Sequence, residues 1–184
     1  IAMIVPLYLI GCGIIGVAVM PAVGLMHWVI EATESHPSLI FKMWAIGSSI
    51  VASVFLTGVS MIFVLPVANF LLLFGRKLKP WRGPYYSLEA IRWYIHNGIL
   101  YMLRYSFLEL FTPSPMAILF YRLMGMKIGR GSVINSTHLS DPCLVTLGKK
   151  VTIGGSAAIV AHYGQAGYLV LAPVEIGDGA TIGL

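Results

Sequence analysis

The sequence predicts two membrane-spanning helices, then interfacial helices, and then a left-handed parallel β-helix. Three observations lead to this prediction. Of the 184 residues, 58% are hydrophobic and only 10% are charged, whereas soluble domains carry about 25% charged residues. Two long stretches contain no Asp, Glu, Lys or Arg, and near the end of the chain aliphatic residues recur at intervals of six. The predicted parts are residues 1–74, 75–127 and 128–184.

The two uncharged stretches are residues 1–30 and 43–74. Each is longer than the ~20 residues that a transmembrane helix requires, so we expect spans at about 3–30 and 43–74, joined by a turn at 31–42. Small residues are frequent in the first half of the second stretch, and such residues allow helices to approach closely in lipid. The two spans are therefore expected to pack as a hairpin.

The segment after the second span fixes the expected orientation. Residues 75–83 contain four basic side chains and no acidic one. By the positive-inside rule, this places them on the cytoplasmic side of a bacterial-type plasma membrane. The net charge of +5 then favours contact with anionic lipid over nucleic acid. Residues 85–110 and 116–125 are rich in aromatic and spaced charged residues, and we expect them to form helices along the membrane surface.

The β-helix prediction rests on hexads that each begin with an aliphatic residue. They begin at Ile128, Ile134, Leu147, Ile153, Ile159 and Ile176, and a last one starts at Ile182. In a left-handed β-helix each hexad forms one face of a triangular coil, with the aliphatic side chain inside and glycine at the tight corner. A coil buries its core only by stacking on the next coil. Insertions interrupt the register at 140–146 and 163–173.

These hexads resemble those of hexapeptide-repeat acyltransferases, which move an acyl group from a pantetheine thioester to a hydroxyl or amine. The strings KPWRGPYY, TPSPMAILFYRLMGMKIGRGSVINS and LSDPCLVTLGKKVTIGGSAAIVAHYG more closely resemble the membrane-bound carboxy-terminal region of polylysine-synthetase-type nonribosomal peptide synthetases. The resemblance covers roughly residues 75–184. It implies a membrane-bound acyl- or aminoacyl-transferase whose donor is acyl-CoA or a carrier-bound phosphopantetheine thioester. Because the chain starts at Ile1 and stops inside a hexad, we expect it to belong to a longer polypeptide.

Acyl transfer needs a general base, and histidine is the side chain best matched to that role near pH 7. Three of the five histidines lie in the predicted spans, their turn and the aromatic helix. His162 directly precedes the 163–173 insertion, where the resembling families place their catalytic base, and His138 is the second candidate. Asp141 is a candidate to orient a histidine by a hydrogen bond. The ordinary alternatives are turn histidines and an Asp-Pro turn.

The alternative function is a catalytically inactive β-helix that acts as a structural or assembly component of a membrane complex. A γ-type carbonic anhydrase would need three histidine ligands for zinc, and the hexads contain only His138 and His162, so no metal site is expected. The expected partners are the lipid bilayer, the acyl donor, and other subunits of a complex or a trimer, since the resembling enzymes are usually trimers. No donor-binding residue and no covalently bound cofactor is predicted.

Overall fold

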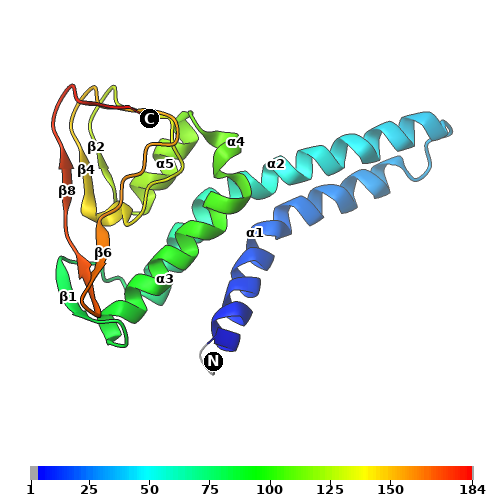
Figure 1. Ribbon diagram of the computed structural model, residues 1–184. Helices are drawn as coiled ribbons and strands as arrows, with labels where there is room; N and C mark the ends of the chain where they lie inside the picture. Colours follow the sequence, from blue (N-terminus) through cyan, green and yellow to red (C-terminus); the bar gives the residue numbers. More distant parts are fainter. Residues whose placement is uncertain (1–3, 184) are drawn as a thin grey trace. The chain divides into compact units, whose positions relative to one another are not determined.

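The computed structural model describes residues 4–183 and divides into two compact units, one up to Val64 and one from Leu65 onward. Residues 1–3, at the start of the first predicted span, and Leu184, at the end of the last predicted hexad, lie outside the described residues. The order of the elements can be followed by colour in Figure 1.

The first unit consists of α1 (Ile4–Thr33) and most of α2 (Leu39–Leu72). Both helices are long and apolar enough to cross a membrane, and the turn between them is shorter than predicted. They contact each other through small residues, since Ala18 and Ala22 are buried and the Ser53 hydroxyl donates to the Ala22 carbonyl at 3.1 Å. Most of their large apolar side chains are exposed, which is compatible with insertion in lipid.

The second unit begins with the end of α2 and contains four further helical segments before its parallel strands. They are α3 (Leu88–Leu103), the π-helical turn η1 (Arg104–Leu108), α4 (Glu109–Phe111) and α5 (Pro115–Leu123). Ser87 caps α3 by accepting a hydrogen bond from the Ala90 amide at 3.1 Å, and Ser114 caps α5 in the same way. One face of α3 is buried within this unit. That the segment also lies along a membrane surface stays a prediction.

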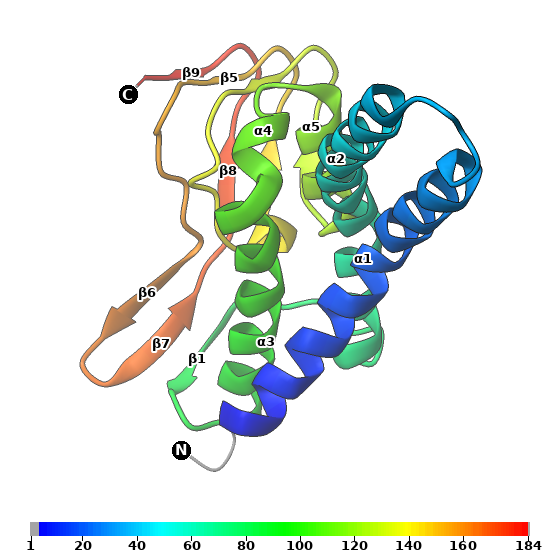
Figure 2. The ribbon, with the colours of Figure 1, turned by 90° about the vertical axis from the view of Figure 1, so that its right-hand side faces the viewer.

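The second unit also holds three sheets of three strands each (Figure 2). One parallel sheet contains β2 (Lys127–Ile128), β4 (Val145–Leu147) and β8 (Val174–Ile176); the other contains β3 (Val133–Ile134), β5 (Thr152–Ile153) and β9 (Thr181–Ile182). The antiparallel sheet has the order β1 (Trp81–Pro84), β7 (Tyr168–Leu171) and β6 (His162–Gln165). A short 3-10 helix, η2 (Pro142–Leu144), precedes β4.

Aliphatic residues that begin the hexads lie side by side in the parallel sheets. In the first sheet Ile128 pairs with Leu147, and Leu147 pairs with Ile176. Glycine is required beside them, because a Cβ atom on Gly129 would lie 2.3 Å from the carbonyl oxygen of Gly148. Residues that begin hexads thus pair across neighbouring strands, and two backbones approach closely beside them.

The predicted left-handed β-helix over 128–184 is nevertheless wrong. The parallel strands are only two or three residues long and form two separate sheets, and the described residues form no closed or solenoid β-helix. Where a third face was expected, the pairing is an isolated bridge between Leu139 and Ile159. Residues 162–171 form an antiparallel hairpin on β1 instead. Aliphatic residues six positions apart, such as Ile128 and Ile134, lie one in each parallel sheet, but this spacing does not determine how many strands join each sheet.

The hairpin of β6 and β7 is closed by Ala166 and Gly167, with φ angles of 49° and 80°. Two consecutive positive φ angles are typical of a type I′ turn, which favours Asn-Gly over Ala-Gly. We expect Ala166→Asn to increase the free energy of unfolding by about 0.5–1 kcal/mol, because asparagine adopts the left-handed conformation more readily than alanine. Urea unfolding of the full chain in detergent micelles would measure it. Ala166→Val should be destabilising, and equal midpoints for all three proteins would contradict the assignment of strain to this turn.

Candidate functional site

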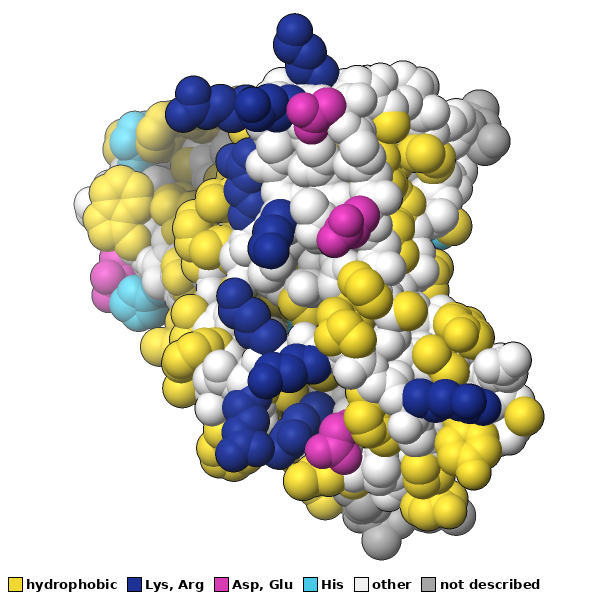
Figure 3. All heavy atoms as spheres, turned by 90° about the vertical axis from the view of Figure 1, so that its left-hand side faces the viewer, with side chains coloured by type: hydrophobic (Ala, Val, Ile, Leu, Met, Phe, Trp, Pro, Cys, Tyr) yellow, Lys and Arg dark blue, Asp and Glu magenta, His cyan; other side chains and the backbone are white. Residues whose placement is uncertain are grey.

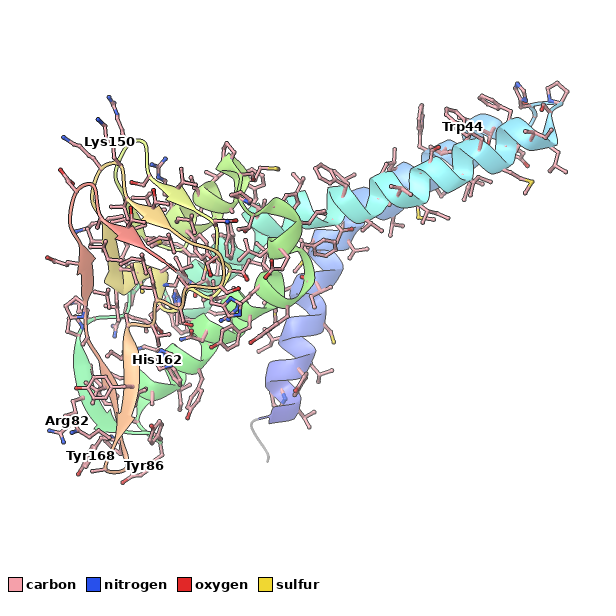
Figure 4. All side chains as sticks on the ribbon, turned by 45° about the horizontal axis from the view of Figure 1, so that its top comes forward. Trp44, Arg82, Tyr86, Lys150, His162 and Tyr168 are labelled. Carbon is pink, nitrogen blue, oxygen red and sulfur yellow. The ribbon has the colours of Figure 1, made fainter. Side chains whose placement is uncertain are left out.

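The centre of the candidate site is a hydrogen bond between His162 and Asp141. The histidine is the first residue of β6, and the aspartate directly precedes η2. The imidazole Nδ1 lies 2.5 Å from the carboxylate Oδ2. Asp141 is fully buried, whereas the His162 side chain remains 21% exposed. Figure 4 shows His162 at the start of β6, beside α3. The buried carboxylate of Asp141 therefore holds the imidazole of His162, which solvent or a ligand can reach.

Helix α3 supplies two further partners of this carboxylate. The indole Nε1 of Trp93 and the amide Nδ2 of Asn97 each donate to Asp141 Oδ1 at 2.8 Å. The two donors are four residues apart, so they project from the same face of the helix. Burial by itself would raise the pKa of Asp141, but the hydrogen bonds from His162, Asn97 and Trp93 and the attraction of the imidazole outweigh it, and the pKa lies below its usual value. The carboxylate is therefore ionised at neutral pH.

The backbone at Asp141 is in the left-handed region, with φ 54° and ψ 52°. This conformation is uncommon for residues other than glycine, although aspartate tolerates it better than most. Hydrogen bonds on either side hold it: the Ser140 amide donates to the Ile159 carbonyl at 2.9 Å, and the Leu144 amide donates to the Asp141 carbonyl at 2.8 Å. Such conformations cluster at functional sites, and here it directs the carboxylate toward α3 and β6.

The hydrogen-bond partners determine the tautomer of His162. Because an ionised carboxylate only accepts hydrogen bonds, Nδ1 of His162 carries the hydrogen. In the neutral imidazole Nε2 then has a free lone pair. The ring of Trp93 meets the imidazole edge-on, with centroids 4.7 Å apart and an interplanar angle of 67°, and so restricts its rotation. This arrangement is the one in which a histidine, oriented by an aspartate, takes a proton from a hydroxyl or an amine.

The structure brings together two of the three residues that the sequence singled out. His162 and Asp141 are in direct contact, while their catalytic roles stay predictions. His138 is exposed; its backbone amide donates to Ser136 Oγ and its carbonyl accepts from Ile159. Sequence reasoning missed Trp93 and Asn97, because it assigned their helix to the membrane surface. The available signal was the four-residue spacing of Trp93 and Asn97, which places both side chains on one face of the predicted helix.

A second polar cluster lies in the same unit around His96. Its Nδ1 is 3.0 Å from Asn69 Oδ1, and its Nε2 is 3.8 Å from Cys143 Sγ. These residues help line a cavity of about 100 Å³. Burial lowers the pKa of His96 to about 4, against the opposing charge of Asp141. Burial and the same negative charge raise the pKa of Cys143 to about 11. Both groups are therefore neutral at pH 7, and the thiol is in its unreactive form.

The described residues thus define a chain with two long apolar helices and, in its second unit, a buried aspartate that holds a partly exposed histidine. No family model matches the chain, and no solved structure matches it. The chain is similar to a delta-poly-L-ornithine synthetase of Acinetobacter baumannii (strain AB307-0294), with 28% identity over 102 residues. The match covers 55% of this chain but only 7% of the synthetase. The resemblance to poly-amino-acid synthetases is therefore supported over a short region, and the resemblance to hexapeptide-repeat acyltransferases has no matching family model.

The buried His96 predicts a loss of stability in acid. Its pKa is about 4 in the folded chain and about 6.5 when unfolded, so between these values the unfolded chain binds more protons. The stabilisation is complete above pH 6.5 and decreases as the pH falls toward 4, by up to about 3 kcal/mol. Asp141 contributes below this window, because its depressed pKa lies under 3.8.

Urea unfolding of the full chain in detergent micelles at several pH values would measure this slope. His96→Gln replaces the imidazole with a neutral amide that does not titrate, and it should flatten the slope between pH 6.5 and 4. His138→Gln is the matched control at an exposed histidine and should leave the slope unchanged. If the wild type and His96→Gln lost stability equally, the acid sensitivity would come from other groups.

Proposed function

We propose that the chain is part of a membrane-bound acyl- or aminoacyl-transferase in which His162, oriented by Asp141, is the general base. The observation that supports this most is the 2.5 Å hydrogen bond between a fully buried carboxylate and a partly exposed imidazole. The donor is a pantetheine thioester, either acyl-CoA or a carrier-bound arm, and the acceptor is an amine or a hydroxyl. An amine is favoured, since a chain similar to this one is named as a poly-L-ornithine synthetase and joining amino acids forms amide bonds.

In the proposed reaction Nε2 of His162 accepts a proton from the acceptor amine as its nitrogen attacks the thioester carbonyl. The new carbon–nitrogen bond forms, and the carbon–sulfur bond of the donor breaks. The imidazolium then returns the proton to the departing thiolate. Asp141 stabilises the imidazolium throughout without itself becoming protonated. Its depressed pKa suits this role, because the carboxylate has to remain charged.

The proposed setting is the cytoplasmic surface of a bacterial-type plasma membrane. Two observations support it: α1 and α2 are long and apolar enough to span, and four basic residues follow α2 without an acidic one. The basic segment is retained on the cytoplasmic side, since positive charges disfavour translocation. The second unit, which follows the basic segment, then faces the compartment that contains acyl-CoA and carrier proteins.

This topology predicts that residue 79 is reachable only from the cytoplasm. In a chain with Cys12 and Cys143 replaced by alanine, Lys79→Cys should react with a membrane-impermeant maleimide only after the cells are opened. His36→Cys, in the turn between α1 and α2, is the matched probe and should react in intact cells. Labelling of Lys79→Cys in intact cells would reverse the proposed orientation.

Replacement of the proposed base should abolish most of the transfer reaction. We expect His162→Ala to lower the turnover of an aminoacyl-pantetheine thioester by 10²–10⁴-fold, the usual cost of removing a general base, and to leave the circular dichroism spectrum unchanged. His138→Ala, at an exposed histidine away from Asp141, is the control and should retain nearly full turnover. Equal turnover of the wild type and His162→Ala would favour the alternative of a non-catalytic component of a membrane complex.

A further inference from the structure

A large basic groove lies in the second unit and shares residues 75–78 with the cavity beside His96. It has a volume of about 740 Å³, within the 300–1,000 Å³ range of small-molecule sites. Its charged lining residues are Arg76, Lys77 and Lys79 from the segment after α2, together with Arg92 and Glu89 from α3, and Trp81 of β1 lines it as well. We call this the basic groove.

The basic groove has an excess of uncompensated positive charge. Glu89 forms an ion pair with Arg92, at 3.5 Å between Oε1 and Nη1. No ion pair joins Arg76, Lys77 or Lys79 to an acidic side chain in residues 4–183. Figure 3 shows Lys and Arg side chains gathered in a band over this face of the molecule. Positive side chains around a concave surface raise the local electrostatic potential and attract anions.

The backbone holds these cations in place. The segment leaves α2 through hydrogen bonds from the Gly75 amide to the Phe70 carbonyl at 2.8 Å and from the Arg76 amide to the Leu73 carbonyl at 3.0 Å. Leu78 is buried between two exposed lysines, so it fixes the segment to the unit while its neighbours point outward. The basic groove is thus formed by an anchored segment.

We propose that the basic groove binds the phosphate group of an organic phosphate ester. Arginine binds phosphate oxygens through paired N–H groups and lysine through its point charge, and the groove contains two of each. Two sources share this chemistry. An anionic phospholipid headgroup is one, because the segment directly follows a helix that could span a membrane. The phosphate-bearing arm of a soluble thioester is the other.

The strand order supports the second source as well. Trp81 of the groove and His162 both pair with Leu171, from opposite sides of β7. Neighbouring strands are about 4.8 Å apart, so the backbone of the groove wall lies about 10 Å from that of His162. An ester whose phosphate is in the groove would have its arm close to the imidazole. The binding itself does not depend on the proposed transfer reaction, so it can be tested without turnover.

The test compares two variants that each lose two positive charges. Arg76→Gln/Lys77→Gln changes the basic groove, whereas Lys149→Gln/Lys150→Gln changes two exposed lysines that do not line it. The full chain in phosphatidylcholine nanodiscs is titrated with coenzyme A by calorimetry. Because each charge-assisted hydrogen bond contributes roughly tenfold in affinity, we expect the groove variant to bind at least tenfold more weakly and the control variant to bind like the wild type.

The second arm uses phosphatidic acid in mixed phosphatidylcholine micelles, with retained lipid counted by native mass spectrometry. If the groove variant, but not the control variant, loses coenzyme A binding, the ligand is a soluble ester. If the groove variant, but not the control variant, loses phosphatidic acid, the ligand is a lipid headgroup. Equal losses in both variants, or no binding of either probe to the wild type, would overturn the proposal. His162→Ala should bind both probes like the wild type, so a failure of the proposed reaction remains distinguishable from a failure of this site.

Discussion

The second unit depends on the hydrogen bonds to the buried carboxylate of Asp141. A charge without water is costly unless hydrogen bonds replace its hydration, and here the replacements come from Trp93 and Asn97 of α3 and from His162 of β6. The requirement to satisfy one carboxylate therefore joins a helix to a strand far along the sequence. Removal of one donor would leave the buried charge with fewer compensating hydrogen bonds, so the position of His162 against α3 is closely determined.

His96 and His162 both lie near the negative charge of Asp141, but their properties differ. His96 is 1% exposed and bonded through both ring nitrogens to protein atoms, so burial keeps it neutral and it has no nitrogen for a substrate. His162 is partly exposed, and the carboxylate occupies only its Nδ1. Cys143 also experiences the charge of Asp141, which adds to burial in raising its pKa to about 11. Of these three groups, His162 is the one that the proposed reaction uses for proton transfer.

Sequence reasoning predicted those features that depend on local patterns. Uncharged length identified two helices long enough to span, and the six-residue spacing singled out aliphatic residues, such as Ile134 and Ile153, that the structure pairs. It failed where the outcome depends on contacts between distant segments. Nearly all residues of β6 and β7 lie within the predicted insertion at 163–173, so the hairpin was missed and a closed β-helix was expected. Asn97 and Trp93 were read as part of a membrane-surface helix, because their shared partner is more than forty residues away.

Strand β7 connects the candidate site with the basic groove. It lies between β1, where Trp81 lines the groove, and β6, where His162 begins. Leu171, which pairs with both of these residues, is buried, so the central strand is fixed by the apolar interior while its two neighbours carry the polar groups. The regular spacing of the strands sets the distance between the backbones that carry Trp81 and His162. The two proposals together therefore require a ligand of defined length, with its charged end in the groove and its reactive end at His162.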